Sequence, residues 1–391
     1  MPKLALNFIC KDEAHVIENM LESVKSITDL IVCNDTGSTD GTQEIIKKFG
    51  EKAGIPTFVF ERQFDNFENS RNHAMVKLRE VATELNWDLS DTWGYWIDCD
   101  EVMSIDPKFN KSQFNRDLYM INTYIRSMKY TRNTFFRLSK DFEWWGPVHE
   151  YIISKSKDIT SGLTEGLHVI VNMTGASWQG EVHEKYRKHS VLLEDYIINK
   201  DRNPRWIFYT AQSFHDSSNV PNNKPESEER LRRALKYYRE RVNRTDGYEE
   251  ERFYSQYRIG TIMRALEMPW KDSMQELLKA YAMEPLRAEP IKTIIDYYLS
   301  VGEYNLAYLH SKFAKVNFHG KNPYPKKLLF VDEALYIWKI LEVHAAACYY
   351  TGRKEESKAN FEEIISLTKT QPNLFSPEDL QKINANKAFF L

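Results

Sequence analysis

Acidic residues at two places in the first half of the sequence could bind a nucleotide or a cation. The run Asp98–Glu101 directly follows the apolar segment Trp93–Ile97, and the run Asp35–Thr42 follows the apolar segment Leu30–Asn34. Carboxylates that gather at the end of a buried strand repel one another unless a cation or a network of hydroxyl groups satisfies them. Oxygen ligands of this kind suit Mg²⁺ or Mn²⁺ bridging the phosphates of a nucleotide.

Both runs also have a purely structural interpretation. Ser38, Thr39 and Asp40 are good helix N-caps, and the glycines beside them tolerate strained dihedral angles, so this run can be a turn with a capped helix. That interpretation does not explain Asp35, whose side chain could accept hydrogen bonds from a base or a ribose hydroxyl. The acidic run Asp98–Glu101 can be a solvated loop, because one D-x-D pattern is a weak signal.

The elements around these runs predict a doubly wound, mostly parallel sheet, and ligands bind such sheets at the carboxyl ends of their strands. A helix opens at Thr39–Thr42 and runs to Phe49, and Leu118–Leu138 favours further strands. The other predicted strands are Leu4–Ile9, Leu30–Asn34, Thr57–Phe60 and Trp93–Ile97, and the other predicted helices are Ala14–Ser26 and Arg71–Leu85.

The second half has helical periodicity from about Trp206 to its end. Two similar turns, Val301–Ala307 and Thr351–Ser357, each place a glycine between two helices. This pattern predicts antiparallel helix pairs in a degenerate tetratricopeptide-like array, with a plain helical bundle as the alternative. We therefore expect an α/β domain over 1–200 and an all-α domain over 201–391, joined near Asp201–Pro204.

Composition excludes several classes of protein. The 391 residues suffice for two domains, and 53 Lys+Arg against 56 Asp+Glu give a net charge of −3, too balanced for a general nucleic-acid binder. No apolar run approaches the ~20 residues of a spanning helix, and charges at Lys11–Glu13 come too early for a signal peptide. Four cysteines without a CxxC pair predict buried thiols rather than disulfides or a zinc site. A cytoplasmic protein is expected.

Five motifs, in order, resemble those of the family 2 glycosyltransferases of GT-A fold. They cover about the first 150 residues, and the helical half resembles the tetratricopeptide-like extension of some bacterial and viral members. Asn7–Glu13 matches the first strand and its "K-N-E" turn, although Asp12 replaces the usual Asn. The other four are Asp35–Thr42 ("D-x-G-S-x-D-G-T"), Phe67–Met75 ("F-x-x-x-R-N-x-A-x"), Asp98–Glu101 ("D-x-D-E") and Trp144–Glu150 ("W-x-G-x-V-H-E").

The resemblance implies a donor site for a nucleotide-sugar, most often a UDP-sugar. Asp35 and Arg71 would hold its base and ribose, although an Arg71 taken alone is better explained by a helix-surface ion pair. Asp98 would lie near the ribose or donor sugar, and Asp100 would bind Mn²⁺ or Mg²⁺ at the diphosphate. Lys11 and Glu13, in the first matched turn, would belong to the same site.

The resemblance also implies inversion at the anomeric carbon, which requires a base to take the acceptor's proton. Glu150 is the candidate base, and His149 would contact the diphosphate or orient Glu150; taken alone, such a pair is more often a surface hydrogen bond. Glu101 would orient the site or cap a turn. Asn172 stands where relatives often carry a metal-approaching histidine, and His183 or His189 could substitute.

The expected function is transfer of a hexose, with glucose the first choice, from a UDP-sugar to a glycan, a peptide or a modified nucleobase. The helical half would dock the acceptor or form a homodimer. One alternative is a non-catalytic nucleotide-binding scaffold, against which the clustered acids argue, and another is nucleotidyl transfer to a sugar phosphate. The basic stretch Glu184–His189 could meet phosphate, but a solvated helix face is the favoured interpretation.

Overall fold

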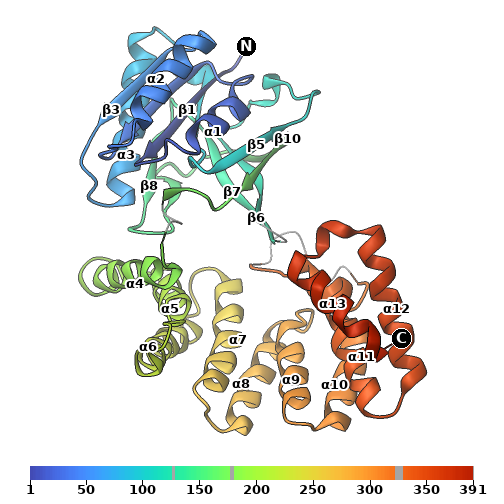
Figure 1. Cartoon of the computed structure of the whole chain (residues 1–391). Helices are drawn as coiled ribbons and strands as arrows, with labels where there is room; N and C mark the ends of the chain where they lie inside the picture. The colour runs from blue at the N-terminus through green and yellow to red at the C-terminus, as the bar shows by residue number, and fades with distance from the viewer. Residues whose placement is uncertain (126–127, 177–179, 322–328, 391) are drawn as a thin grey trace. The chain divides into compact units, whose positions relative to one another are not determined.

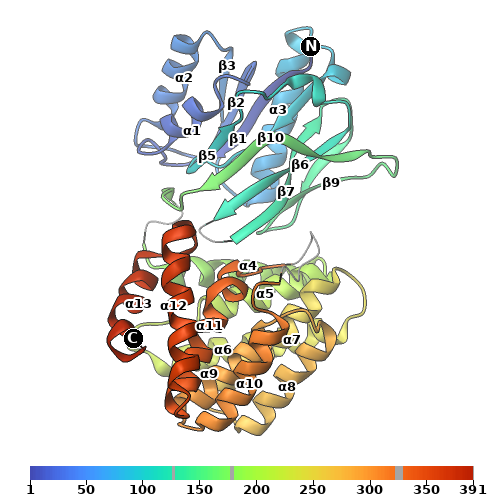
Figure 2. The same cartoon turned by 90° about the vertical axis from the view of Figure 1, so that its right-hand side faces the viewer.

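The computed structural model describes residues 1–125, 128–176, 180–321 and 329–390. The chain divides into two compact units, Met1–Asp201 and Arg202–Leu391. The first unit is a mixed α/β structure built on a sheet, and the second unit is helical (Figures 1 and 2).

The first unit contains a mixed sheet of eight strands in the order β3-β2-β1-β4-β7-β6-β10-β5. Its central strand β1 is buried along almost its whole length because its apolar run faces helices on both sides. Strands β3, β2, β1 and β4 run parallel to one another, whereas β7 pairs antiparallel with both β4 and β6. The strands are β1 (Lys3–Cys10), β2 (Leu30–Asp35), β3 (Thr57–Glu61), β4 (Thr92–Tyr95), β5 (Glu101–Ile105), β6 (Leu118–Ile125), β7 (Met128–Arg137) and β10 (Ser161–Val171), with β8 (Phe142–Trp145) and β9 (Tyr151–Ser154) in a separate hairpin.

Helices cover both faces of this sheet (Figure 1). One core joins alternate β1 residues, such as Leu6 and Phe8, to α1 (Ile17–Val24) and α2 (Thr42–Ala53). The other core joins Ala5 and β2 to α3 (Phe67–Glu84). The unit ends with α4 (Val182–Asn199). The alternation of side chains along each strand thus builds the two-faced parallel half that the sequence predicts.

The predicted strands form, but the fourth ends earlier than predicted. Strand β4 stops at Tyr95, where its pairing with β1 stops, rather than at Ile97. The chain then leaves the sheet and returns at Glu101 as β5, a strand that the sequence did not predict and that pairs antiparallel with β10. The stretch 96–100 is therefore a connection, and it carries the acidic run. The strands expected within Leu118–Leu138 are confirmed as β6 and β7.

The second unit is an array of helices in which each helix packs against the next one along the chain. The helical content predicted from about Trp206 to the end is confirmed across the described residues of this unit. The likeness to tetratricopeptide repeats stays a prediction. The helices are α5 (Pro204–Asp216), α6 (Lys224–Asn243), α7 (Glu249–Ala265), α8 (Trp270–Met283), α9 (Glu289–Ser300), α10 (Tyr304–Asn317), α11 (Ile340–Tyr350, preceded by a π-helical turn, Leu335–Lys339), α12 (Lys354–Thr370) and α13 (Pro377–Phe390).

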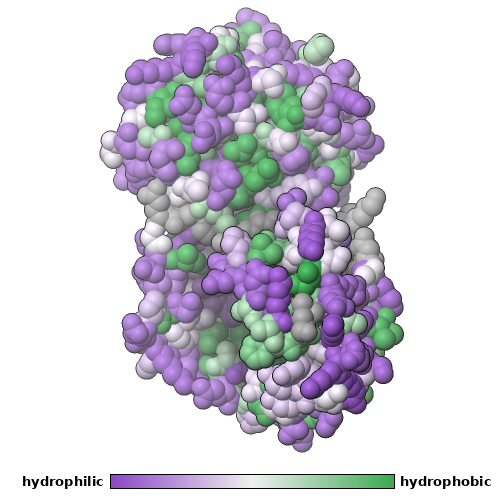
Figure 3. Space-filling view, turned by 45° about the vertical axis from the view of Figure 1, so that its right-hand side comes forward, coloured by the Kyte–Doolittle hydropathy of each residue, from purple (hydrophilic) through white to green (hydrophobic). Residues whose placement is uncertain are grey.

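The surface shown in Figure 3 is mainly hydrophilic, with hydrophobic side chains in small patches. Across the described part of the chain, the helices are all too short or too polar to cross a bilayer.

Candidate active site

Two loops at the carboxyl ends of β1 and β2 bind each other through side-chain hydrogen bonds. The backbone N–H of Asp12 donates to Ser38 Oγ at 2.9 Å, and the N–H of Thr39 donates to Asp12 Oδ1 at 2.8 Å. Asp12 has a φ of +54°, a left-handed conformation that Asp and Asn adopt more readily than most residues. The "K-D-E" turn and the glycine-rich turn therefore form one structural unit.

Asp35, at the end of β2, organises the glycine-rich turn. Its Oδ1 accepts hydrogen bonds from the N–H groups of Gly37 and Ser38, each at 2.8 Å. Burial by itself would raise the pKa of Asp35, but the hydrogen bonds from Ser38 and Gly37 outweigh burial and lower it. A turn therefore does explain why an acidic residue ends this strand, contrary to the argument from sequence. The residue is buried, with 0% exposure.

Arg71 joins two of the predicted site residues. Its Nε donates to Glu150 Oε1 at 2.6 Å, and a terminal nitrogen donates to Asp98 Oδ1 at 2.7 Å. Arg71 lies on α3, Glu150 lies in the segment after β8, and Asp98 lies in the connection after β4. They meet although 79 residues separate Arg71 from Glu150 in sequence. An isolated surface ion pair, the alternative considered for Arg71, is therefore wrong.

Two tryptophan rings enclose the Arg71 guanidinium. Its central carbon lies 4.9 Å from the ring centroid of Trp96 and 4.7 Å from that of Trp144. Arg71 is 7% exposed, and burial alone would lower its pKa, but the charges of Asp98 and Glu150 raise it above its ordinary value. The guanidinium thus stays charged and fixes the positions of both carboxylates.

A second buried ion pair supports the connection that carries Asp98 and Asp100. Glu101 is 2% exposed and accepts hydrogen bonds from both terminal nitrogens of Arg132 on β7. Glu101 also accepts from the backbone N–H of Asp98 at 3.0 Å. Burial raises the pKa of Glu101 and outweighs the charge of Arg132. Of the two roles considered for Glu101, positioning of the acidic run is the one that these contacts favour.

Asp100 and Glu13 both face the segment that follows β10. The N–H of Gly175 donates to Asp100 Oδ2 at 3.2 Å, and the N–H of Ala176 donates to both oxygens of Glu13 at 3.1 Å. A Cβ on residue 175 would lie 3.1 Å from Asp100 Cγ, a tight contact that would require the Asp100 side chain to shift by a few tenths of an ångström. Burial, opposed by the Ala176 hydrogen bond and reinforced by the charge of Asp100, raises the pKa of Glu13 to about 7.

The remaining predicted residues lie around this group. Lys11 is exposed at the first residue after β1. His149 has a φ of +56°, and its ring packs edge-on against the ring of His189 on α4, with centroids 6.0 Å apart. His149 and Glu150 are adjacent in sequence but contact different partners, His189 and Arg71. Asn172 donates its backbone N–H to the carbonyl of Asp100 at 3.3 Å.

Within Glu184–His189, which the sequence favours as a solvated helix face, Lys185 is partly buried. Burial lowers the pKa of Lys185 to about 8, although the nearby charges of Asp100 and Asp98 favour its ammonium form. Burial and the charge of Lys185 also lower the pKa of His189, to about 4. The charge of Lys185 on α4 therefore interacts with the charges of the two predicted donor-site carboxylates, Asp98 and Asp100.

The protein donors at Asp100 fit a cation only if other ligands complete its coordination. Among the described residues, no group of three His, Cys, Asp or Glu side chains close enough to share an ion includes Asp100. One or two carboxylates suffice for Mg²⁺ when substrate phosphates and water supply the other oxygens. His183 instead faces Glu181 and Glu184, with its ring nitrogens 3.7 and 3.8 Å from their oxygens.

The raised pKa of Glu13 predicts a pH-dependent stability. The unfolded chain loses this proton near pH 4.3, whereas the folded chain keeps it to about pH 7. Stability from this group is therefore complete below the unfolded pKa and is lost as the pH rises through 7. We expect Glu13→Gln to remove this loss, so that its melting temperature falls less than that of the wild type between pH 5 and pH 8. Glu18→Gln, at an exposed site on α1, should leave the slope unchanged, and equal slopes for all three proteins would contradict the prediction.

Two residues of the site, Arg132 and Trp96, were not predicted from the sequence. Arg132 could have been noticed as a charge within a strand-forming segment, and Trp96 lies inside the apolar run before the acidic residues. The partner of each depends on long-range pairing.

Part of the chain is similar in sequence to proteins named as glycosyltransferases. The chain is 26% identical over 226 residues to the SPbeta prophage-derived glycosyltransferase SunS of Bacillus subtilis (strain 168) and to the glycosyltransferase SunS of Bacillus phage SPbeta. The aligned region spans 55% of this chain and half the length of SunS. The crystal structure of S. aureus TarS has a TM-score of 0.35 and 11% sequence identity, and the match covers 66% of this chain and 52% of TarS. The crystal structure of S. aureus TarS 1–349 has a TM-score of 0.32 and 11% identity, and that match covers 82% of this chain and 93% of the TarS chain. No protein-family model matches the chain.

Proposed function

We propose that the chain is an inverting, metal-dependent glycosyltransferase that transfers a hexose, with glucose the first choice, from a UDP-sugar to an acceptor. The observation that carries this proposal is the Arg71 ion triad, because one buried cation draws Asp98 and Glu150 together from distant parts of the sequence. Partial sequence similarity to SunS, named a glycosyltransferase, supports the proposal.

In this proposal the donor binds at the carboxyl ends of β1, β2 and β4. Asp98 lies toward the ribose or donor sugar, and Lys11 and Glu13 border the same loops. Asp35 serves through the glycine-rich turn that it holds, and Arg71 serves by positioning the two carboxylates. Asp100 would hold Mn²⁺ or Mg²⁺, which when bound neutralises the developing charge of the leaving diphosphate.

Glu150 is the proposed base. Arg71 engages Oε1 of Glu150, so we assign proton acceptance to Oε2. As the acceptor's oxygen attacks the anomeric carbon, its proton passes to Glu150 and the bond to the diphosphate oxygen breaks. His149, directed toward α4, would orient the segment or contact the diphosphate, and Lys185 supplies a positive charge near Asp98 and Asp100.

The helical unit is proposed to serve the acceptor, which we restrict to a glycan, a peptide or a nucleic-acid base, or to form a homodimer. Stacked helices present extended surfaces suited to such ligands.

Calorimetric titration of UDP-, GDP- and TDP-sugars, with and without Mn²⁺, tests the donor half. We expect one UDP-sugar to bind in a Mn²⁺-dependent manner and Asp100→Ala to weaken that binding at least ~10-fold, since a carboxylate ligand is lost. Asp106→Ala, at an exposed turn after β5, is the matched control and should bind normally. A folded protein that binds none of these sugars would overturn the proposal and favour a scaffold.

A further inference from the structure

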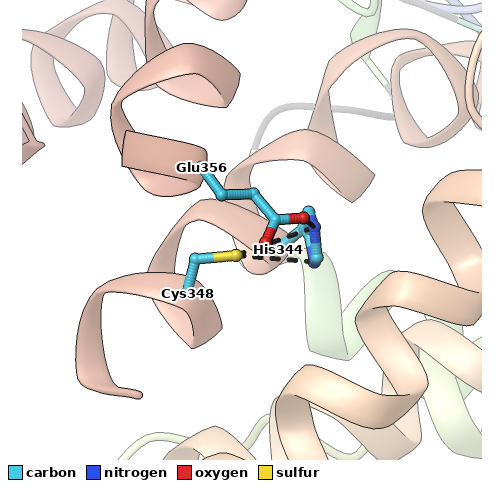
Figure 4. A group of neighbouring side chains, drawn as sticks. All are labelled: His344, Cys348 and Glu356. Carbon is cyan, nitrogen blue, oxygen red and sulfur yellow. Dashed lines mark hydrogen bonds and ion pairs between the residues drawn. The ribbon is translucent and has the colours of Figure 1, made fainter. Parts of the chain in front are cut away.

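Three side chains with metal-binding atoms meet inside the helical unit. His344 and Cys348 lie one turn apart on α11, and Glu356 lies near the start of α12 (Figure 4). His344 Nε2 is 3.0 Å from Glu356 Oε1 and 3.6 Å from Cys348 Sγ. One donor atom from each residue lies within 4.8 Å of the other two. Because Cys348 has no cysteine near it in sequence, spacing alone predicted no zinc site.

We propose that His344, Cys348 and Glu356 form a Zn²⁺ site. A tetrahedral Zn²⁺ with bonds of about 2.0–2.1 Å to nitrogen and oxygen and about 2.3 Å to sulfur separates its ligands by about 3.3–3.5 Å. The observed separations of 3.0 and 3.6 Å are close to these values, and the third pair of donor atoms lies within 4.8 Å. Nitrogen, thiolate and carboxylate together suit Zn²⁺ better than Mg²⁺ or Ca²⁺, which prefer oxygen alone.

A hydrogen bond from outside the triad orients the imidazole. Ser311 Oγ on α10 lies 2.9 Å from His344 Nδ1 and donates its own proton to the carbonyl of Tyr308 at 3.1 Å. A hydroxyl has one proton, so with this arrangement Nδ1 carries a hydrogen and donates to Ser311. Nε2 is then the nitrogen with a lone pair, and it faces Glu356. A cation bound between Nε2 and the carboxylate would replace the repulsion between these two hydrogen-bond acceptors with attraction.

Burial and charge also fit a divalent ion. His344 and Cys348 are both 0% exposed, whereas the Glu356 side chain is 38% exposed and gives the site a path to solvent. A thiolate and a carboxylate together balance the two charges of Zn²⁺. Glu356 Oε2 also accepts from Tyr308 at 3.2 Å, so the carboxylate is held on its second oxygen.

The site would brace the end of the helical array. Its ligands lie on either side of the turn between α11 and α12, and Ser311 adds a link to α10. Three protein ligands leave a fourth position for water at the exposed side. The bound ion would therefore raise the stability of this helix pair without depending on the first unit's chemistry.

Metal binding by the intact chain tests this inference. After chelator treatment, we expect one equivalent of Zn²⁺ to bind and raise the melting temperature, and Co²⁺ to give the thiolate charge-transfer band of a cysteine ligand. Ser311→Ala, which removes the orienting hydrogen bond together with the one to the Tyr308 carbonyl, should weaken Zn²⁺ binding about 10–100-fold. Cys348→Ser should abolish the Co²⁺ band, whereas His310→Ala, at a half-exposed histidine on α10, should change nothing.

The wild-type measurement decides the question even if a variant fails to fold. A folded, chelator-treated chain that shows no thiolate–Co²⁺ band and no Zn²⁺-dependent rise in melting temperature overturns the site, leaving a hydrogen-bonded triad only. Zn²⁺ binding that persists in folded Cys348→Ser also overturns it, because the ion would then be bound elsewhere. Neither result bears on UDP-sugar binding, which the calorimetry tests separately.

Discussion

Replacing Arg71 with methionine is expected to lower the stability of the first unit by about 3 kcal/mol, because it leaves two carboxylates without their cation. Most of the loss in stability comes from Glu150, whose side chain is only 10% exposed. The Asp98 side chain is 41% exposed, so water solvates its charge in part. Methionine keeps much of the length that packs between Trp96 and Trp144. The loss is therefore mainly electrostatic, with a smaller part from the cation–π contacts.

Hydrogen exchange of the intact chain, read on peptides from β1, β2 and β4, measures this loss in the first unit alone. Arg62→Met is the matched control, because Arg62 pairs with Asp65 at 2.9 Å and both side chains are more than a third exposed. Its cost should stay below about 1 kcal/mol. Equal protection in the two variants would show that the Arg71 triad adds no stability.

The stability that is lost in Arg71→Met should also depend on pH. Burial alone would raise the pKa of Asp98, but Arg71 and Arg132 reverse that effect and lower it below its ordinary value. Stability from this carboxylate is therefore present above the unfolded pKa of about 3.9 and is lost as the pH falls through the lowered folded value. The difference between wild type and Arg71→Met should accordingly shrink in acid.

Local patterns predicted the elements well and their ends less well. Apolar runs such as Leu4–Ile9 were sufficient for the buried strands, because a strand covered by helices on both faces needs little else. Strand β5 was not predicted because its first residue is the charged Glu101. A charged residue there is typical of a loop, and its buried partner Arg132 cannot be recognised from the local sequence. Long-range pairing, absent from any single segment, decides such cases.

The site shows the same division. The sequence brought Arg71, Asp98 and Glu150 forward as candidates, and the fold gathers them around one cation. Their mutual contacts were not predictable, because they depend on how α3 and the segment after β8 pack against the sheet. The hydrogen bonds of Asp35 were likewise not predicted: its Oδ1 accepts from the turn that follows β2, and its Oδ2 accepts from the Cys10 thiol on β1.

Glu150→Gln should reduce turnover of a UDP-sugar by about 10²–10⁴-fold, the usual contribution of a positioned general base. Glutamine keeps an oxygen to accept the hydrogen bond from Arg71 Nε, so the variant should fold and bind the donor as the wild type does. UDP release with water as the acceptor measures turnover without knowledge of the natural acceptor.

Glu143→Gln on β8 is the matched control, because Glu143 pairs only with the exposed Lys155 among the contacts of the described structure, at 3.1 Å. It should turn over the donor at the wild-type rate. If Glu150→Gln binds the donor normally and also keeps the wild-type rate, a different group must accept the proton. Glu13, with a pKa of about 7 and a place beside Asp98 and Asp100, is then the carboxylate to replace next, because a base works best when its pKa lies near the operating pH.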